Sequence, residues 1–189
     1  RMTGVPGLCI ATLGPGATNL TTGVGSAWLD RSPLIAITCT LNEEQLGRRL
    51  QMWIDHHALF KPITKGTFRL RPGGIVATLA QALQLALSEP QGPVHLDLPE
   101  DVALAEATET LAPATESMRP MPERVPLAPA PEASIARAGA LLRAARRPVA
   151  VIGASAMRIR DPLLLRVFVE RHQIPFATTM MAKGLIDEG

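Results

Sequence analysis

The sequence predicts an α/β fold in which short apolar strands alternate with amphipathic helices. Residues 8–13, 34–39 and 94–98 are short apolar runs bounded by glycine or proline, which is typical of strands buried in a parallel sheet. Apolar residues recur at helical spacing over 73–89, the clearest amphipathic helix. A Gly-Pro-Gly turn at 14–16 joins the first strand to a helix. We therefore expect a parallel sheet with helices packed on it.

The remaining segments of the chain continue this alternation of strands and helices. Small residues over 16–29 predict a helix that relies on packing against another surface, and the turn chemistry around the other segments indicates short strands and helices. These expected segments are a short helix at 55–60, a strand at 66–70, a helix at 131–145, a strand at 149–152, a helix at 162–172 and a strand at 176–179.

The composition changes between residues 103 and 131 and indicates a boundary between two domains. Six prolines stand in a stretch of Ala, Thr and Glu, which favours an extended linker over a packed element (Pro113, Pro120, Pro122, Pro126, Pro129 and Pro131). We expect a first domain over 1–102 and the start of a second, Rossmann-like α/β domain over 132–189. Two strands do not complete a parallel layer, so we expect this second domain to be truncated.

Composition excludes several classes of protein. The 189 residues are 47% hydrophobic, sufficient for a core, yet no apolar run approaches the ~20 residues that span a bilayer. The net charge is +2 and the arginines lie scattered along helices, so neither a nucleic acid nor a membrane is an expected partner. Without a signal peptide before the first strand, we expect a cytoplasmic protein. Cys9 and Cys39 lie in strands expected to be buried, and we interpret both as reduced, structural thiols.

The residues expected to carry chemistry contain no metal-ligand cluster. His56, His57, His95 and His172 lack the spacing of zinc ligands, so no metal is expected here. His95, in a strand, and His172, in a helix, are interpreted as structural.

The Gly-Pro-Gly turn has two interpretations on physical grounds. Gly14 and Gly16 carry no Cβ, so the backbone can adopt unusual angles and another molecule can approach closely. The helix that follows exposes unpaired N–H groups, which favour an anion or a polar ring. The turn lies at the carboxyl end of a strand, where open α/β sheets bind ligands. The alternative is an ordinary turn that any α/β domain needs.

Four ordered motifs resemble the thiamine diphosphate enzymes of the acetolactate synthase type. The first is Thr12-x-Gly14-Pro15-Gly16-Ala17-Thr18-Asn19, which is similar to the hallmark loop of the family's pyrimidine-binding domain. The others are Asp30-x-x-Pro33-Leu34-Ile35-Ala36-Ile37-Thr38, Asp55 through Ile63-Thr64-Lys65, and Gly92-Pro93-Val94-His95-Leu96-Asp97-Leu98-Pro99-x-Asp101-Val102. Residues 147–153 and 175–184 resemble the opening of the family's central domain.

The resemblance implies a lyase or carboligase (transferase) acting on 2-keto acids with thiamine diphosphate. Gly14, Pro15, Gly16, Ala17 and Asn19 would bind the cofactor beside the reactive centre. The diphosphate and Mg²⁺ would bind a different domain of a partner subunit, which implies a homodimer or homotetramer. FAD is a further cofactor of some members, and the resemblance leaves its presence open.

Five residues are candidates for the substrate side of this site: Gln51, Asp55, His56, His57 and Lys65. The histidine pair falls where some pyruvate-decarboxylase-type relatives place a pair that handles protons. The alternative is that one ring points to solvent and the other packs beneath the loop. Many relatives have a glutamine where Met52 stands, and Gln51 is one place off. Lys65 has a structural interpretation of equal weight.

Two parts of the family's apparatus are not found in the sequence. The activating glutamate belongs on a helix upstream of residue 1, and the Mg²⁺ motif begins Gly-Asp-Gly, whereas no Asp-Gly pair occurs here. We therefore expect an internal fragment that is inactive alone. Two rival interpretations are a non-catalytic binding or regulatory module that keeps the pyrimidine-domain fold, and a nucleotide-binding Rossmann protein organised on Gly153, which lacks the G-x-G-x-x-G fingerprint.

Overall fold

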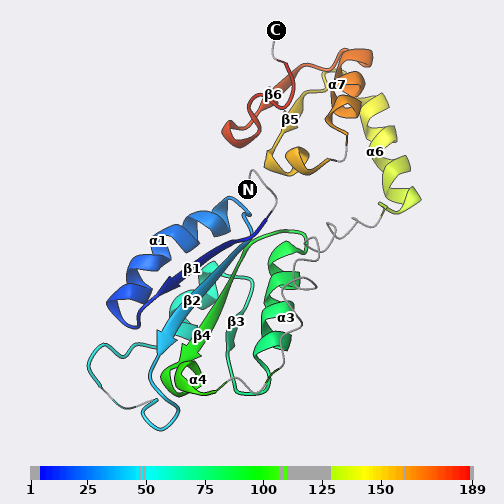
Figure 1. The fold of residues 1–189 in the computed structure, drawn as a ribbon. Coiled ribbons are helices and arrows are strands. Elements are labelled where there is room, and N and C mark those ends of the chain that lie inside the picture. The colour runs from blue at the N-terminus through cyan, green and yellow to red at the C-terminus, as the bar shows by residue number, and fades with distance from the viewer. Residues whose placement is uncertain are drawn as a thin grey trace. The chain divides into compact units, whose positions relative to one another are not determined.

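The computed structural model describes residues 5–46, 48, 50–106, 109, 129–159 and 161–187. The chain forms two compact units, Arg1–Leu127 and Ala128–Gly189. Figure 1 shows both units, with the first coloured from blue to green and the second from yellow to red.

The first unit is a parallel α/β sheet, which confirms the predicted fold class. Its strands are β1 (Gly7–Ala11), β2 (Leu34–Thr40), β3 (Thr67–Arg69) and β4 (Pro93–Pro99). All neighbours pair in parallel, in the order β1-β2-β4-β3. The helices are α1 (Pro15–Leu29), α2 (His56–Phe60) with the 3₁₀ turn η1 (Lys61–Ile63), α3 (Ile75–Leu87) and α4 (Glu100–Leu104).

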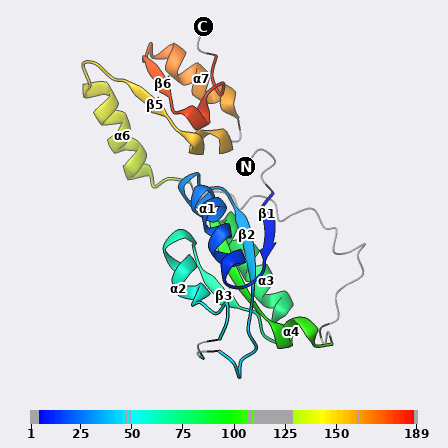
Figure 2. The ribbon, with the colours of Figure 1, turned by 90° about the vertical axis from the view of Figure 1, so that its left-hand side faces the viewer.

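The two faces of this sheet are covered by different helices. Ile35, Val94 and Leu96 form one core with Ala82 and Ala86 of α3. On the other face, Ala36 packs with α1 and α2, and the members of this second core are Ala17, Val24, Ala36 and Phe60. Successive side chains of a strand point to opposite faces, so the alternate residues of β2 and β4 sort between these two cores. Figures 1 and 2 show α1 and α2 on one side of the sheet and α3 on the other.

The prediction that the first strand is buried is wrong for half of its side chains. β1 lies at an edge of the sheet, and Leu8 and Ile10 are 65% and 63% exposed. They lie in register with Ile35 and Ile37, on the face where α3 packs against β2 and β4. Cys9 points to the other face, and both cysteines are half-buried free thiols.

The end of the first unit differs from the prediction in one helix. A short helix, α4, follows β4 and reaches Leu104, two residues beyond the predicted boundary at 102. The carboxylate of Glu109 accepts hydrogen bonds from the N–H groups of Ile75 (2.7 Å) and Val76 (2.9 Å), so it caps α3. Most of the expected linker, 107–108 and 110–128, lies outside the described residues, and the domain boundaries stay predictions.

The second unit pairs two short strands with helices. Its elements are α6 (Glu132–Ala144), β5 (Ala150–Ile152), the 3₁₀ turn η2 (Ala154–Arg158), α7 (Pro162–Arg171), β6 (Phe176–Thr178) and the 3₁₀ turn η3 (Met180–Ala182). β5 and β6 are parallel. The small core consists of Ile152, Val169, Ala182 and Ile186.

Candidate functional site

The turn between β1 and α1 requires glycine at its first position. Gly14 has φ of 60° and ψ of −112°, a combination that side chains with a Cβ rarely adopt. A Cβ added there would overlap the carbonyl oxygen of Met52. At Gly16 an added Cβ would come within 2.7 Å of the Thr12 side chain. The turn is therefore packed tightly against its own protein.

Three N–H groups of this turn have partners within the protein and are therefore not the free donors that were expected at the start of the helix. Gly14 N–H donates to His56 Nε2 (3.4 Å), and Gly16 N–H donates to the Leu13 carbonyl (3.3 Å). Thr18 N–H donates to the Gly14 carbonyl (3.0 Å). Pro15 and Asn19 are exposed, whereas Ala17 is fully buried. The turn therefore offers a backbone wall rather than a ring of donors.

A buried polar cluster lies beneath the turn and consists of Thr38, His56, His95 and Asp97, each at most 4% exposed. Thr38 and Asp97 are register partners at the carboxyl ends of β2 and β4. Thr38 Oγ1 lies 2.8 Å from His95 Nε2, 3.1 Å from His56 Nδ1 and 3.3 Å from Asp97 Oδ1. His56 Nδ1 lies 3.0 Å from Asp97 Oδ1.

The electrostatics of the cluster favour an ionised Asp97 and a neutral His95. Burial alone would raise the pKa of Asp97, but the hydrogen bond from His56 and the nearby histidines outweigh it and lower that pKa. Burial lowers the pKa of His95 to about 3, and the attraction of Asp97 opposes this only in part. Arg69 Nη2 lies 3.4 Å from Asp97 Oδ2 and supplies a positive neighbour.

The two adjacent histidines have different environments. His56 is 3% exposed and packs under the turn. The side chain of His57 is 34% exposed; its Nδ1 lies 2.6 Å from Thr67 Oγ1 and its Nε2 3.8 Å from Asp97 Oδ2. One ring therefore supports the turn while the other reaches the surface.

A small cavity of about 160 Å³ opens beside the cluster at the carboxyl edge of the sheet. It is lined by polar residues of β2, β3 and β4, by apolar residues of the loop before α2, and by the cap and first two residues of α2: Thr40, Leu46, Trp53, Ile54, Asp55, His56, His57, Arg69 and Asp97. Three of the five substrate-side candidates, Asp55, His56 and His57, are thus brought together.

The structure places the other two candidates elsewhere. Lys65 Nζ donates to the carbonyls of Leu85 (2.5 Å) and Ser88 (2.6 Å), so it caps the carboxyl end of α3, and burial lowers its pKa. Gln51 is exposed and does not line the cavity. Asp55 itself caps α2, because its Oδ1 accepts from Ala58 N–H (2.9 Å).

Sequence reasoning did not identify Thr38, Asp97 and Arg69 as members of the site, and it took His95 as structural alone. One signal was available: His95 and Asp97 are polar residues two apart in an otherwise apolar strand, so they share one face. Thr38 is likewise polar near the end of β2.

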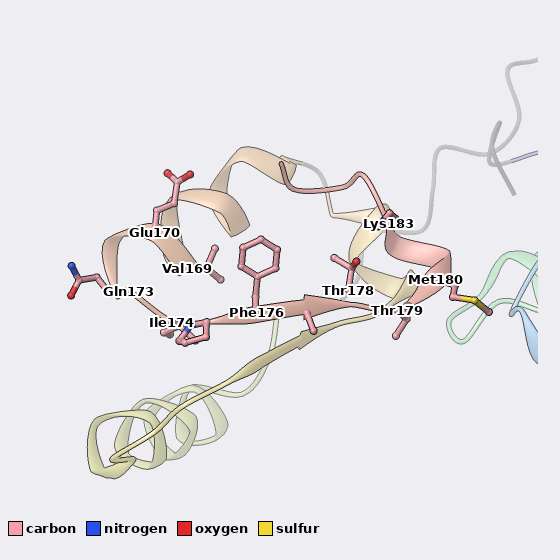
Figure 3. A pocket seen from close by; sticks show the side chains of 11 residues that line it. Val169, Glu170, Gln173, Ile174, Phe176, Thr178, Thr179, Met180 and Lys183 are labelled. Atoms are coloured by element: carbon pink, nitrogen blue, oxygen red, sulfur yellow. The ribbon is translucent and has the colours of Figure 1, made fainter. Parts of the chain in front are cut away.

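A second, larger cavity of about 820 Å³ lies in the second unit, beside β6. Figure 3 shows Phe176 of β6 and Val169 of α7 pointing toward one another, with Glu170 and Gln173 at one end and Met180 and Lys183 at the other. Its lining is mainly apolar. Within the described ranges, no group of three or more His, Cys, Asp or Glu side chains could hold a metal ion.

Comparison with known proteins gives matches to two domains of one family. Residues 1–59 match the N-terminal TPP binding domain of thiamine pyrophosphate enzymes, and residues 135–189 match their central domain. Among the residues that the structure describes, no helix combines the length and apolar character of a membrane crossing.

Similar proteins are acetolactate synthase large subunits. The chain is 35% identical over 189 residues to the probable large subunit of Methanocaldococcus jannaschii, covering all of this chain and 32% of that protein. It is 35% identical to the large subunit of Corynebacterium glutamicum, of which it covers 30%. With the isozyme 1 large subunit of Escherichia coli it shares 34% over 187 residues, 98% of this chain and 32% of the relative.

The chain spans about a third of the length of these relatives. The two matched domains occur in the family's order and together account for more than half of the chain, and the glycine turn lies within the first of them. On this evidence the chain belongs to the thiamine pyrophosphate enzyme family.

Proposed function

We propose that this chain provides the pyrimidine-binding surface of a thiamine diphosphate-dependent lyase or carboligase that acts on a 2-keto acid. The observation that carries the proposal is the Gly14 turn, fixed above a buried Asp97–His56 pair and next to a cavity that His57 lines. The likeness to acetolactate synthase large subunits over the whole chain supports the same reaction class.

The turn fits the flat aminopyrimidine ring of the cofactor. Gly14, Pro15, Gly16, Ala17 and Asn19 would hold it, because Met52 packs against Gly14 and Thr12 against Gly16, which fixes the backbone surface on which a ring would lie. When bound, the cofactor supplies the electron sink that stabilises negative charge on the carbon next to a cleaved bond. The protein's own part is to place that ring and to exclude water around it.

The cavity suits a small carboxylic acid. Its volume of about 160 Å³ admits a molecule of the size of pyruvate, and Arg69 and His57 line it. Arg69 Nε is buried and has no hydrogen-bond partner among the described residues, so it has a donor to offer. We propose that Arg69 orients the substrate carboxylate and that His57, the more exposed ring, transfers protons.

Further partners follow from the same proposal. We infer that Mg²⁺ accompanies the diphosphate, that the protein works as a homodimer or homotetramer in the cytoplasm, and that it has no nucleic-acid or membrane partner. The near-neutral formal charge of +2 supports the last inference. The visible absorbance of the purified protein decides whether FAD is also bound.

Turnover of pyruvate by the protein expressed from its complete reading frame tests the proposal. We expect consumption that depends on both thiamine diphosphate and Mg²⁺, with acetolactate formed by a carboligase and acetaldehyde by a decarboxylase. Cofactor binding without turnover of any 2-keto acid would favour the non-catalytic module instead. Absence of both binding and turnover would contradict the proposal.

The role of His57 has its own test. His57→Gln should lower kcat about 100-fold with a smaller change in KM, because proton transfer contributes on this scale. His172→Gln, at an exposed ring that ends α7, is the matched control and should leave kcat unchanged. An unchanged kcat in His57→Gln would remove His57 from the mechanism.

A further inference from the structure

We infer that His56 is a positioning residue that holds the Gly14 turn as a single neutral tautomer, set by Asp97. The ring touches the turn at one end and the carboxylate at the other, and both histidines line the cavity, His57 as the more exposed of the two. The consequence for the cofactor rests on the proposed function, whereas the tautomer itself does not.

The donors and acceptors around His56 allow only one arrangement. A backbone N–H can only donate, so Nε2 must offer its lone pair to Gly14. The ring proton then lies on Nδ1, which faces Asp97 Oδ1 at 3.0 Å, and an ionised carboxylate can only accept. The opposite tautomer would set an N–H against the N–H of Gly14 and leave Asp97 without this donor. Both contacts therefore select the Nδ1–H form.

The rest of the cluster is consistent with this assignment. Thr38 has one hydroxyl proton, which it donates to Asp97 Oδ1 (3.3 Å). His95 must then donate from Nε2 to Thr38 Oγ1 (2.8 Å), which leaves His95 Nδ1 as a lone pair. That atom has no partner among the described residues, and a buried lone pair is better tolerated than a buried, unpaired N–H. Every donor of the cluster is thereby directed, through Thr38 or His56, toward Asp97.

The packing around the His56 ring fixes its position and, through its hydrogen bond, the position of the Gly14 turn. His56 is 3% exposed, and the neighbouring ring of His95 stacks on Phe60 with centroids 4.3 Å apart. Gly14 meets the Met52 backbone on another side, so the turn is held between a carbonyl and an imidazole. Loss of the Nε2 acceptor would leave the Gly14 N–H buried and unsatisfied, which favours a shifted turn.

Nitrogen NMR of the ¹⁵N-histidine-labelled protein tests the tautomer without any cofactor. The chain has four histidines, so single substitutions assign the signals. We expect the long-range ¹H–¹⁵N pattern of His56 to show a protonated Nδ1 and an unprotonated Nε2 at neutral pH. The Nε2–H tautomer, or an imidazolium, would overturn the inference.

A pair of variants separates positioning from a general structural role. His56→Gln places an amide oxygen near the site of Nε2 and can still accept from Gly14, whereas His56→Asn retains only a donor near Nδ1. We expect hydrogen exchange at Gly14 about tenfold faster in His56→Asn than in His56→Gln, with unchanged exchange in α3. Thiamine diphosphate affinity should fall about tenfold in His56→Asn and be largely retained in His56→Gln.

The outcomes distinguish this inference from the proposed function. Equal exchange at Gly14 in both variants would overturn the positioning role even if the protein is an active enzyme. A difference in exchange in a protein that does not bind thiamine diphosphate would support the positioning role and contradict the function. If His56→Asn does not fold, the tautomer measured in the unchanged protein decides.

Discussion

The buried ring of His95 should make the first unit sensitive to acid. Its pKa is lowered from 6.5 to about 3, first by burial and then by His57 and His56, while Asp97 opposes the shift. In the unfolded chain the ring takes up a proton near its ordinary pKa, but the folded protein resists that proton. The unfolded state therefore binds more protons between these two values, and the free energy of unfolding falls as the pH falls from 6.5 toward 3.

The size of the effect follows from the two pKa values. At about pH 5 the unfolded ring is almost fully protonated and the folded ring is neutral, which costs about 2 kcal/mol of stability relative to neutral pH. Asp97 acts in the same direction in a more acidic range. Its pKa is lowered in the folded state, so the stability it contributes is lost as the pH falls from the ordinary pKa of an aspartate through that lowered value.

Urea unfolding followed by tryptophan fluorescence measures this loss. Both tryptophans, Trp28 and Trp53, lie in the first unit and report on it. We compare the unchanged protein with His95→Leu at about pH 7.5 and about pH 5; leucine fills much of the ring's volume, and Thr38 can still donate to Asp97. In the unchanged protein the free energy of unfolding differs between the two pH values. That difference should shrink by about 2 kcal/mol in His95→Leu, but not in His172→Gln. The same pH dependence in His95→Leu would refute a neutral, buried His95.

Three further substitutions test the turn and its supports. Gly14→Ala should lower the free energy of unfolding, measured by thermal unfolding, by about 2–3 kcal/mol, because Gly14 has a positive φ and its added Cβ would overlap the Met52 carbonyl. The control Gly25→Ala has open space around it and should be neutral or stabilising by up to about 1 kcal/mol. Gly16→Ala should lower the melting temperature, because its Cβ would lie 2.7 Å from the Thr12 side chain, and should also weaken thiamine diphosphate binding, measured by calorimetry, because the turn must shift; intact binding with a lower melting temperature would contradict a role of the turn in binding. Lys65→Met should destabilise the protein by about 1–2 kcal/mol in urea unfolding, because the last carbonyls of α3 lose their donor, and an unchanged midpoint would show that the cap is dispensable.

The helices and strands were predictable because the spacing of apolar residues in the sequence indicates each of them. The helix expected over 73–89 is Ile75–Leu87, and the strand expected over 94–98 is Pro93–Pro99. Burial was less predictable, since Leu8 and Ile10 read like core residues yet lie on an edge strand. The order β1-β2-β4-β3 determines which strand is at the edge, and an apolar run carries no information about its neighbours.

The site was predictable where its residues are contiguous and unpredictable where the sheet assembles it. The Gly14 turn is a local signal, because two glycines around a proline limit the backbone whatever surrounds them. Thr38, His56 and Asp97 are far apart in the sequence and meet only because β2 and β4 are neighbours with Thr38 opposite Asp97. A shift of one residue in that register would send Asp97 to the α3 face and dissolve the cluster.

Helix phase explains why two identical, adjacent side chains receive different surroundings. Asp55 caps α2 and so fixes where the helix begins, which places His56 at its first residue, directed into the buried cluster. The next residue is turned by about 100° around the helix axis, and His57 therefore reaches Thr67 and the cavity. If the helix began one residue earlier, His56 would take the place of His57, and if it began one residue later, His57 would take the place of His56. The pair is thus better treated as two separate residues than as one motif, and variants that replace both at once would mix the loss of a proton-transferring ring with the loss of the turn's support.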